Sequence, residues 1–357
     1  MRDMLKKKMS KNTRSNLITY GIVIVAFIVM QTLISTGSIS SLMEGLMIPL
    51  CIYIILAVSL NLVVGILGEL SLGHAGFMCV GAFASAFFSK CMRDVITIAP
   101  LRFFLALLIG VAVAAVFGII IGIPVLRLKG DYLAIVTLAF GEIIKNLVNV
   151  LFIGKDSNGF HFSTKDVMDL NMEADGTVIV NGPQGITGTP QDSTFVIGVI
   201  LILITLFIVI NMVNSRDGRA IMAIRDNRIA AESVGINVTK YKLMAFTVSA
   251  ALAGAAGVLY AHNLSTLTAN TNNFGYNMSI NILVFVVLGG IGSIRGSMIA
   301  AVVLTLLPEL LRGLSDYRML IYAVVLIIMM LFNWSPKAIE WREKYLSFGK
   351  KKKEAVK

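Results

Sequence analysis

Charged residues are scarce in this sequence of 357 residues, in which Asp, Glu, Lys and Arg together make up 14%. A soluble domain carries about 25% of these residues. Cysteine and histidine are scarcer still, with three of each. Cys51, Cys79 and Cys91 are odd in number and unevenly spaced, which argues against a disulfide framework and against a metal site. His161 and His262 likewise lack the spacing of metal ligands.

Nucleotide-binding and catalytic motifs are also missing from the sequence. No stretch fits G-x-x-x-x-G-K-[S/T], in which a glycine-rich loop and a lysine hold nucleotide phosphates. The glycine clusters at 182–188 and 289–296 have no lysine at the required place. We therefore expect no cofactor on this chain, no ATP hydrolysis by a P-loop and no enzymatic activity.

Apolar residues are abundant, because hydrophobic residues make up 57% of the chain and glycine contributes 31 further positions. A water-soluble globule of this size could not hide so much apolar surface. The net charge of +11 lies at the two ends of the chain and in one central loop. No basic domain stands apart from the apolar runs, which excludes a nucleic-acid partner. The composition predicts an all-α integral membrane protein in a lipid bilayer.

Ten apolar segments approach the roughly 20 residues that a helix needs to cross the bilayer. They are 17–35, 44–66, 72–89, 101–123, 132–153, 194–213, 243–262, 279–292, 297–311 and 319–333. The third and the eighth are short and cut by glycine, so we predict that these two helices are interrupted.

The basic residues orient these segments, since Lys and Arg concentrate on the cytoplasmic side of a membrane. With the N-terminus inside, cytoplasmic segments hold 23 lysines and arginines and outer segments hold seven. Both termini are thus predicted to be cytoplasmic. The expected divisions are a basic N-terminus (1–16), a first transmembrane half (17–153), an extracytoplasmic loop (154–192), a second transmembrane half (193–334) containing a cytoplasmic loop (214–242), and a basic tail (335–357).

The ten segments divide into two halves of five with opposite orientation, and the interrupted segment is third in each half. Paired interrupted helices are typical of a translocation site in inverted-repeat transporters; glycine and serine that only permit close helix packing are the alternative. The candidate path residues are Glu69, Ser71, Gly73, His74, Gly289 and Gly292. Glu69 and His74 could line a path, hold a broken helix by hydrogen bonds, or lie at the membrane interface. Glu142 and Lys145 are three apart and can form an ion pair.

Five motifs are too particular for generic membrane helices. They are LGELSLGHAGF at 67–77, LKGDYLAIVTLAFGE at 128–142, GPQGITG at 182–188, SRDGRAIMAIRDNRIAAESVGIN at 215–237 and LGGIGSIRGS at 288–297. Together and in this order they resemble the LivM-type permease subunits of branched-chain amino acid ABC importers. The resemblance covers roughly 45–315, and residues 155–180 look longer than the family's usual approach to the glycine-proline turn.

The resemblance implies a transport subunit in a bacterial cell membrane, which forms a path for leucine, isoleucine or valine with a second permease. Two ATPase subunits would drive it, and an external binding protein would deliver substrate near Gly182, Pro183 and Gly185. A urea or short-amide permease of the same family is the near alternative. An ion-coupled secondary transporter, with Glu142 as the ion-binding acid, is an alternative of another class.

The central loop 214–242 has helix signals of its own. Ser215 or Asp217 can cap a helix start, and Gly235 suits its end, with a break near Asn227. Ile221, Ile224, Ile229 and Val234 are among the residues that form apolar patches between the charges. With the resemblance, this segment is expected to be the helix that couples to the ATPase; a helix lying on lipid headgroups is the alternative. The candidate coupling residues are Arg219, Arg225, Asp226, Asn227, Ala231, Glu232 and Gly235.

Overall fold

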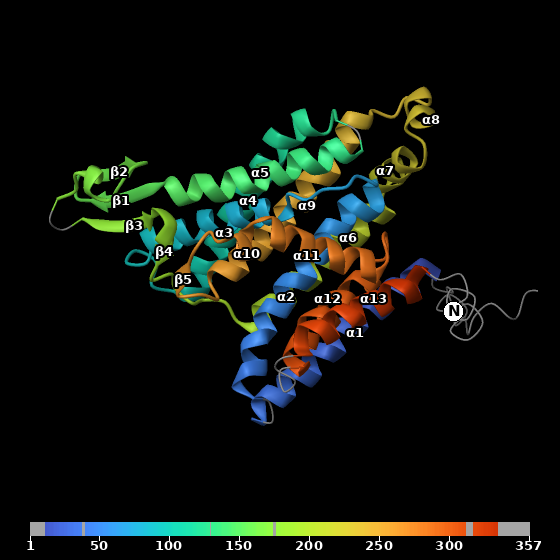
Figure 1. The fold of residues 1–357 in the computed structure, drawn as a ribbon, viewed down its shortest axis with the longest axis horizontal. Coiled ribbons are helices and arrows are strands. Elements are labelled where there is room, and N and C mark those ends of the chain that lie inside the picture. Colours follow the sequence, from blue (N-terminus) through green and yellow to red (C-terminus); the bar gives the residue numbers. More distant parts are fainter. Residues whose placement is uncertain (1–10, 38–39, 129, 174–175, 312–316, 335–357) are drawn as a thin grey trace, which may run out of the picture.

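A computed structural model describes residues 11–37, 40–128, 130–173, 176–311 and 317–334. The predicted basic tail (335–357) and residues 1–10 of the predicted basic N-terminus lie outside the described residues. The molecule is an elongated bundle of helices with small β-sheets at one end (Figure 1). Helices α7 and α8 lie at the opposite end (Figure 1).

The first half of the chain forms five long helices. They are α1 (Lys11–Ser35), α2 (Ser41–Asn61), α3 (His74–Cys91), α4 (Ala99–Val125) and α5 (Asp131–Val150), with a π-helical turn η2 (Leu62–Leu67) that continues α2. The second half contains α6 (Phe195–Asn214), α7 (Arg216–Asp226), α8 (Arg228–Ser233), α9 (Val238–Ala261), α10 (Thr271–Phe274), α11 (Tyr276–Gly289), α12 (Ile294–Leu310) and α13 (Arg318–Trp334).

Each of the ten predicted segments overlaps one of these helices. Within the described residues, six helical segments are long and apolar enough to cross a membrane by length and composition. They are Asn16–Ser35, Ser41–Leu67, Ala99–Val125, Asp131–Val150, Phe195–Asn214 and Val238–Ala261. The other four of the ten predicted segments correspond to the shorter helices α3, α11, α12 and α13.

The expectation of a purely α-helical protein is wrong for the loop 154–192. Strands β1 (Phe152–Asp156), β2 (Gly159–Ser163) and β3 (Thr177–Asn181) form an antiparallel sheet in the order β2-β1-β3. Strand β4 (Ile186–Thr187) pairs with β5 (Thr266–Leu267), which precedes α10. Short runs of aromatic and β-branched residues between turn residues favour strands here, a signal that the overall helical pattern concealed.

The predicted interruptions lie between helices and not within them. Helix α3 runs without a break over 18 residues. The chain breaks before it, where Gly68 ends η2 with φ of +80°. Likewise α11 ends at Gly289, and the turn that follows contains Gly290 (φ +95°) and Gly292 (φ +82°). These positive φ angles suit glycine and terminate helices, so the glycines mark connections.

Close packing of α2, α3 and α4 around α9 forms the core. A Cβ atom on Gly81 of α3 would lie 2.5 Å from the Cα atom of Gly254 in α9. A Cβ atom on Gly257 would lie 2.1 Å from the carbonyl oxygen of Met78. Small residues that bring helix backbones together are typical of membrane helix pairs, because tight packing replaces the hydrophobic driving force in lipid. Any larger side chain at Gly81 or Gly257 would force the helices apart.

Candidate functional site

The connection between η2 and α3 is held by a buried ion pair. The Lys242 ammonium of α9 donates to the Glu69 carboxylate, and the two side chains are 6% and 15% exposed. Both charges are thereby largely removed from solvent, and their mutual attraction offsets the free-energy cost of desolvation. The pair joins the start of α3 to the start of α9.

Neutral hydrogen bonds hold the same connection from two further helices. The His74 ring nitrogen Nε2 lies 2.7 Å from Ser59 Oγ of α2, and His74 is buried. The Leu72 backbone N–H donates to Thr137 Oγ1 of α5 over 3.0 Å. A Cβ atom on Gly73 would lie 2.3 Å from the Thr137 carbonyl oxygen, so only glycine fits there.

These contacts favour one of the three roles predicted for this segment. Ser71, Gly73 and His74 are buried inside the chain, and Glu69 is engaged by Lys242. We therefore interpret this segment as a clamp, in which the ion pair and the hydrogen bonds hold the connection between η2 and α3 in place. It is not an exposed face on which a solute could move.

The turn between α11 and α12 packs on the same connection. The Gly292 backbone N–H donates to Asn61 Oδ1 over 2.9 Å, and Asn61 Nδ2 donates to Ser297 Oγ over 3.0 Å. A Cβ atom on Gly65 of η2 would lie 2.3 Å from the Gly292 nitrogen, and one on Gly289 would lie 2.4 Å from the backbone of Gly296. Close packing, the alternative reading, thus accounts for Gly289 and Gly292.

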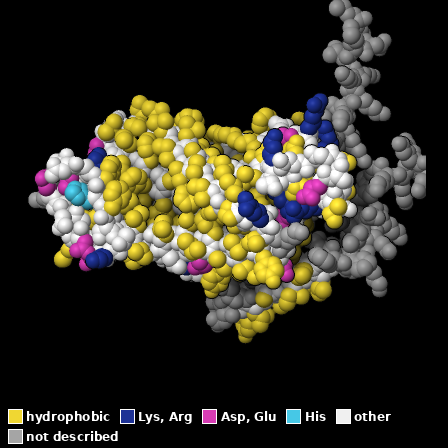
Figure 2. Space-filling model, turned by 90° about the horizontal axis from the view of Figure 1, so that it is seen from above, with side chains coloured by type: hydrophobic (Ala, Val, Ile, Leu, Met, Phe, Trp, Pro, Cys, Tyr) yellow, Lys and Arg dark blue, Asp and Glu magenta, His cyan; other side chains and the backbone are white. Residues whose placement is uncertain are grey.

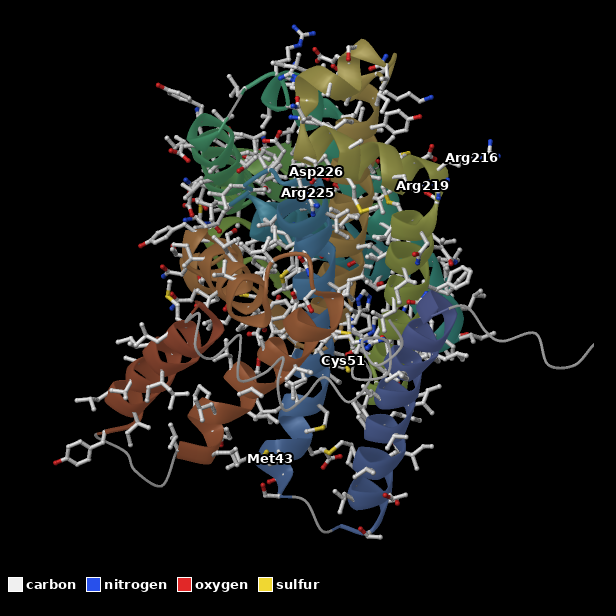
Figure 3. The ribbon with its side chains drawn as sticks, turned by 90° about the vertical axis from the view of Figure 1, so that its right-hand side faces the viewer. Met43, Cys51, Arg216, Arg219, Arg225 and Asp226 are labelled. Carbon is white, nitrogen blue, oxygen red and sulfur yellow. The ribbon has the colours of Figure 1, made fainter. Side chains whose placement is uncertain are left out.

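Helix α7 reaches this connection through Arg225. Its guanidinium Nη1 donates to the Gly65 carbonyl oxygen over 3.1 Å, and its Nε and Nη2 donate to Asp226 Oδ1. Figure 3 shows Arg225 and Asp226 over the end of α2, whereas Arg216 points away from the molecule. A Cβ atom on Gly68 would lie 2.5 Å from Arg225 Cγ, so the helix and the connection are in tight contact. Movement of α7 must therefore press on η2.

The predicted helix signals of the loop 214–242 are confirmed. Ser215 Oγ accepts from the Gly218 N–H over 3.0 Å and caps α7. Asn227 ends α7, and its Oδ1 accepts from the Ala230 N–H over 3.1 Å to cap α8. Gly235 follows α8 with φ of +86°, a conformation that disfavours residues with a side chain.

The apolar residues of this loop divide between two surfaces. Ile221 and Ile224 of α7 are buried against the bundle, and Ala231 is buried between Ile224 and Val238. The Ala231 side chain is therefore covered by its own chain, and its closeness to a partner stays a prediction. The exposed apolar residues are Ile229 and Val234, with 80% and 75% of their surface in solvent.

The charged candidates of α7 and α8 lie on the outside. Arg219 is exposed, and its Nη1 donates to the Asn214 carbonyl oxygen over 3.3 Å. Glu232 accepts from Arg228 Nε over 3.1 Å in an exposed pair. The exposed Arg228–Glu232 pair lies in the same short helix as Ile229, so α8 combines an apolar and two charged side chains, as protein contacts often do.

A second exposed surface lies on α5 and α11, which are in contact. Its apolar members include Ile143 and Leu147 of α5 and Ile280 of α11. Asn146 of α5 and Asn281 of α11 are also exposed at this face. By contrast, the exposed residues of α4 are apolar along the whole helix, as expected of a lipid contact. Figure 2 shows a broad hydrophobic band between charged groups at the two ends.

The predicted Glu142–Lys145 pair is confirmed. Lys145 Nζ lies 2.5 Å from Glu142 Oε2 and 3.1 Å from Thr271 Oγ1. Glu142 Oε1 also accepts from the Tyr276 N–H over 2.8 Å at the start of α11. The only acid proposed for an ion-coupled transporter is thus already engaged by a lysine and by the N-terminus of α11. This arrangement favours a structural role for Glu142.

The turn at Gly182–Gln184 (η4) lies beside the sheets. The Gly182 N–H donates to the Leu151 carbonyl oxygen over 3.1 Å. A Cβ atom on Gly185, whose φ is +69°, would lie 1.9 Å from the Leu267 carbonyl oxygen. Gly182 and Gly185 are buried, and Pro183 is exposed at the end of the molecule. Only Pro183 of the three predicted residues can therefore contact a partner directly.

A cavity of about 480 Å³ lies between α1, α2, α6 and α12. Its walls are apolar and include Cys51, Phe195 and Met298. Such a cavity has no group that could orient a polar solute. Among the described residues no group of three or more His, Cys, Asp and Glu could hold a metal ion.

The long apolar helices, the lipid-like face of α4 and the rigidly attached helices α7 and α8 define a polytopic membrane protein of the transport class. Residues 42–332 match the family described as branched-chain amino acid transport system, permease component. The chain belongs to this family.

Curated relatives agree with the family match. A high-affinity branched-chain amino acid transport system permease protein, LivM, of Salmonella typhimurium is 35% identical over 297 residues, which cover 81% of this chain and 67% of the relative. LivM of Escherichia coli is 36% identical over 298 residues with the same coverage. The permease protein LivH of Salmonella typhimurium is 23% identical over 78% of this chain and 88% of the relative. No solved structure matches.

Proposed function

We propose that this chain is one permease subunit of an ATP-driven importer for leucine, isoleucine and valine. The observation that carries the proposal is the family match over 42–332, together with identity of 35–36% to two LivM proteins. LivH, which carries the same transport-system name, is the model for a second permease subunit. ATP hydrolysis belongs to separate ATPase subunits, and substrate arrives on an extracytoplasmic binding protein.

The proposal includes ten crossings in a five-plus-five arrangement within a bacterial cell membrane. Helices α3, α12 and α13 have 18, 17 and 17 residues, lengths of about 26–27 Å at 1.5 Å per residue. These lengths approach the roughly 30 Å hydrocarbon core. Helix α11 is shorter, with 14 residues, and extends toward the outer side through α10. Both termini and the loop 214–242 are then cytoplasmic, in agreement with the charge distribution.

Helices α7 and α8 are the proposed contact with the ATPase. Ile229 and Val234 are exposed large apolar residues, and the exposed Arg228–Glu232 pair belongs to the same segment. Arg225 transmits movement of α7 to η2, and the Glu69–Lys242 pair links η2 to α9. A conformational change of the ATPase would thus reach three helices at once.

The face of α5 and α11 is the proposed wall of the translocation path, with the second permease supplying the opposite wall. Asn146 and Asn281 can bond a passing solute, whereas two such residues on a lipid-exposed face would be costly. The aliphatic neighbours Ile143, Leu147 and Ile280 suit a branched apolar side chain.

Uptake of radiolabelled leucine by the complete importer, reconstituted in vesicles with ATP inside, tests the proposal. Ile229→Asp places a charge in the proposed ATPase contact, so uptake should fall at least tenfold and the ATPase subunits should co-purify poorly. The matched control is Val95→Asp, because Val95 is 75% exposed in the connection before α4 at the other end. It should retain near-normal uptake.

The two parts of the proposal can fail separately. Normal uptake and normal ATPase retention in Ile229→Asp would reject the assigned ATPase contact. Absence of leucine, isoleucine and valine uptake by the wild-type importer would reject the substrate class. Uptake of radiolabelled urea would then indicate the short-amide branch of the family.

A further inference from the structure

A second cavity opens in the small sheet that follows α5. It has a volume of about 340 Å³ and lies between β2 and the turn η3 (Met168–Leu170). Its lining residues are Leu151, Phe162, Ser163, Thr164, Lys165 and Asp169. Five of the six belong to the segment 155–180, which is longer than the family pattern suggests.

The cavity carries one charge of each sign. Lys165 supplies an ammonium group and Asp169 a carboxylate. Within the described residues neither side chain has a hydrogen bond or an ion pair, and the two do not pair with each other. The other acids of this sheet are engaged, since Asp156 pairs with His161, and Glu173 accepts from Ser157 and Asn158.

Apolar side chains complete the lining. Phe162 is 65% exposed, although a free aromatic ring in water is unfavourable. Leu151 lies opposite in the lining, and the hydroxyls of Ser163 and Thr164 add polar groups. The apolar 480 Å³ cavity of the helical bundle has no comparable set of charges.

We propose that this cavity is a binding site for a free aliphatic α-amino acid at the outer mouth of the translocation path. Lys165 binds the α-carboxylate, Asp169 binds the α-ammonium group, and the aliphatic side chain packs on Phe162 and Leu151. The zwitterion satisfies both unpaired charges, and a ligand with one charge satisfies only one. This inference rests on the proposed function, because it assigns a substrate subsite to the same transport path.

The position of the cavity supports its role. Leu151 directly follows α5, whose exposed residues include Ile143, Leu147 and Val150, so the cavity lies at the end of this helix. Figure 1 shows the β1–β2 hairpin directly beyond the end of α5. The proposed site thus lies next to the outer end of the proposed α5–α11 wall.

Equilibrium dialysis against the complete permease–ATPase complex, without the binding protein, tests the site with three probes. The probes are L-leucine, N-acetyl-leucine, which lacks the ammonium group, and leucinamide, which lacks the carboxylate. The wild-type complex should bind leucine at least tenfold more tightly than either analogue. Lys165→Gln should abolish the preference over leucinamide only, and Asp169→Asn the preference over N-acetyl-leucine only.

Lys155→Gln and Asp166→Asn are matched controls, because they make the same charge changes in the same segment outside the cavity. Both should bind all three probes like the wild type. Unchanged binding in Lys165→Gln and Asp169→Asn, or an equal loss for all three probes, would overturn the site. A loss of uptake that appears only with the binding protein, at unchanged leucine binding, would also overturn it and indicate a docking surface.

Wild-type leucine uptake separates this inference from the function on which it rests. If the wild-type importer takes up leucine and the cavity does not bind it, only the inference is rejected. If the wild-type importer takes up no branched-chain amino acid, the proposed function itself is rejected.

Discussion

The two ends of the helical bundle carry their charged side chains in different environments. At the α7 end, Glu69 and Lys242 are paired and almost completely buried, and Arg225 bonds the backbone of η2. At the sheet end, Lys165 and Asp169 face one open cavity and have no partner among the described residues. A paired buried charge fixes the position of a helix, whereas an unpaired accessible charge remains available to a ligand.

The difference fits the two tasks of an ATP-driven permease. A coupling contact must transmit a movement without yielding, so its polar groups bond to one another inside the chain. A substrate contact must exchange partners rapidly, so its polar groups remain in solvent until the ligand arrives. The following substitutions probe this comparison, in order of expected effect.

Glu69→Gln should give the largest effect, because it leaves the Lys242 ammonium buried without a counter-charge. Loss of one partner of a buried pair costs about 3–5 kcal/mol of folding free energy. We expect a clearly lower thermal midpoint of the purified protein in detergent. The double variant Glu69→Gln, Lys242→Gln should recover most of the loss. Glu232→Gln, in the exposed pair with Arg228, should cost about 0.3–0.5 kcal/mol or less.

If Glu69→Gln melts like the wild type, the pair is not the clamp that the geometry indicates. Equal losses in Glu69→Gln and Glu232→Gln would remove the contrast between a buried and an exposed pair.

Arg225→Ala should have an intermediate effect. It removes a charged hydrogen bond to the Gly65 carbonyl oxygen, worth about 1.5–3 kcal/mol, and leaves α7 itself capped by Ser215. We expect ATPase activity of the complex to continue while leucine uptake per ATP hydrolysed falls several-fold. Arg216→Ala is the control, because Arg216 points away from the molecule (Figure 3). The same uptake-to-hydrolysis ratio in both variants would contradict transmission through Arg225.

The smallest expected effect concerns the pH response of the sheet end. Burial alone would raise the pKa of Asp156, but bonds from the Glu173 and Asn158 N–H groups and from His161 outweigh it and lower that pKa. A lowered pKa in the folded state stabilises the sheet above the unfolded value of about 3.9, and this is lost as pH falls through the folded pKa. Amides of 156–159 should therefore exchange hydrogen faster below about pH 4, relative to other sheet amides.

Asp156→Asn removes the titrating group and should flatten this pH response. The amides of α3 and α9 provide an internal reference in the same experiment. A variant with the wild-type pH response would show that another group causes it.

Some local features of this protein could be predicted from the sequence. Local chemistry explains the helix caps at Ser215 and Asn227 and the positive φ of Gly235. Each of these features depends only on side chains and backbone within four residues of it. The ion pair of Glu142 and Lys145 follows from helical spacing alone. The five motifs identify the family without any coordinates.

The surroundings of the candidate path and coupling residues depend on contacts between distant segments of the chain. Glu69 looked like a path residue until the fold placed Lys242, which is 173 positions away, beside it. The sequence did not show that Ala231 packs with Ile224 and Val238. No local pattern contains these contacts, because they arise when helices far apart in the sequence pack together.

The sequence by itself determined that this protein is a multi-pass membrane protein, where its helices run and to which family it belongs. Hydrophobic runs, charge asymmetry and capping act over one segment at a time, so they can be read along the chain. Only the tertiary structure decided which polar residues bond one helix to another and which remain accessible. That choice is made by burial and by the partner at each side chain, and both exist only in the packed molecule.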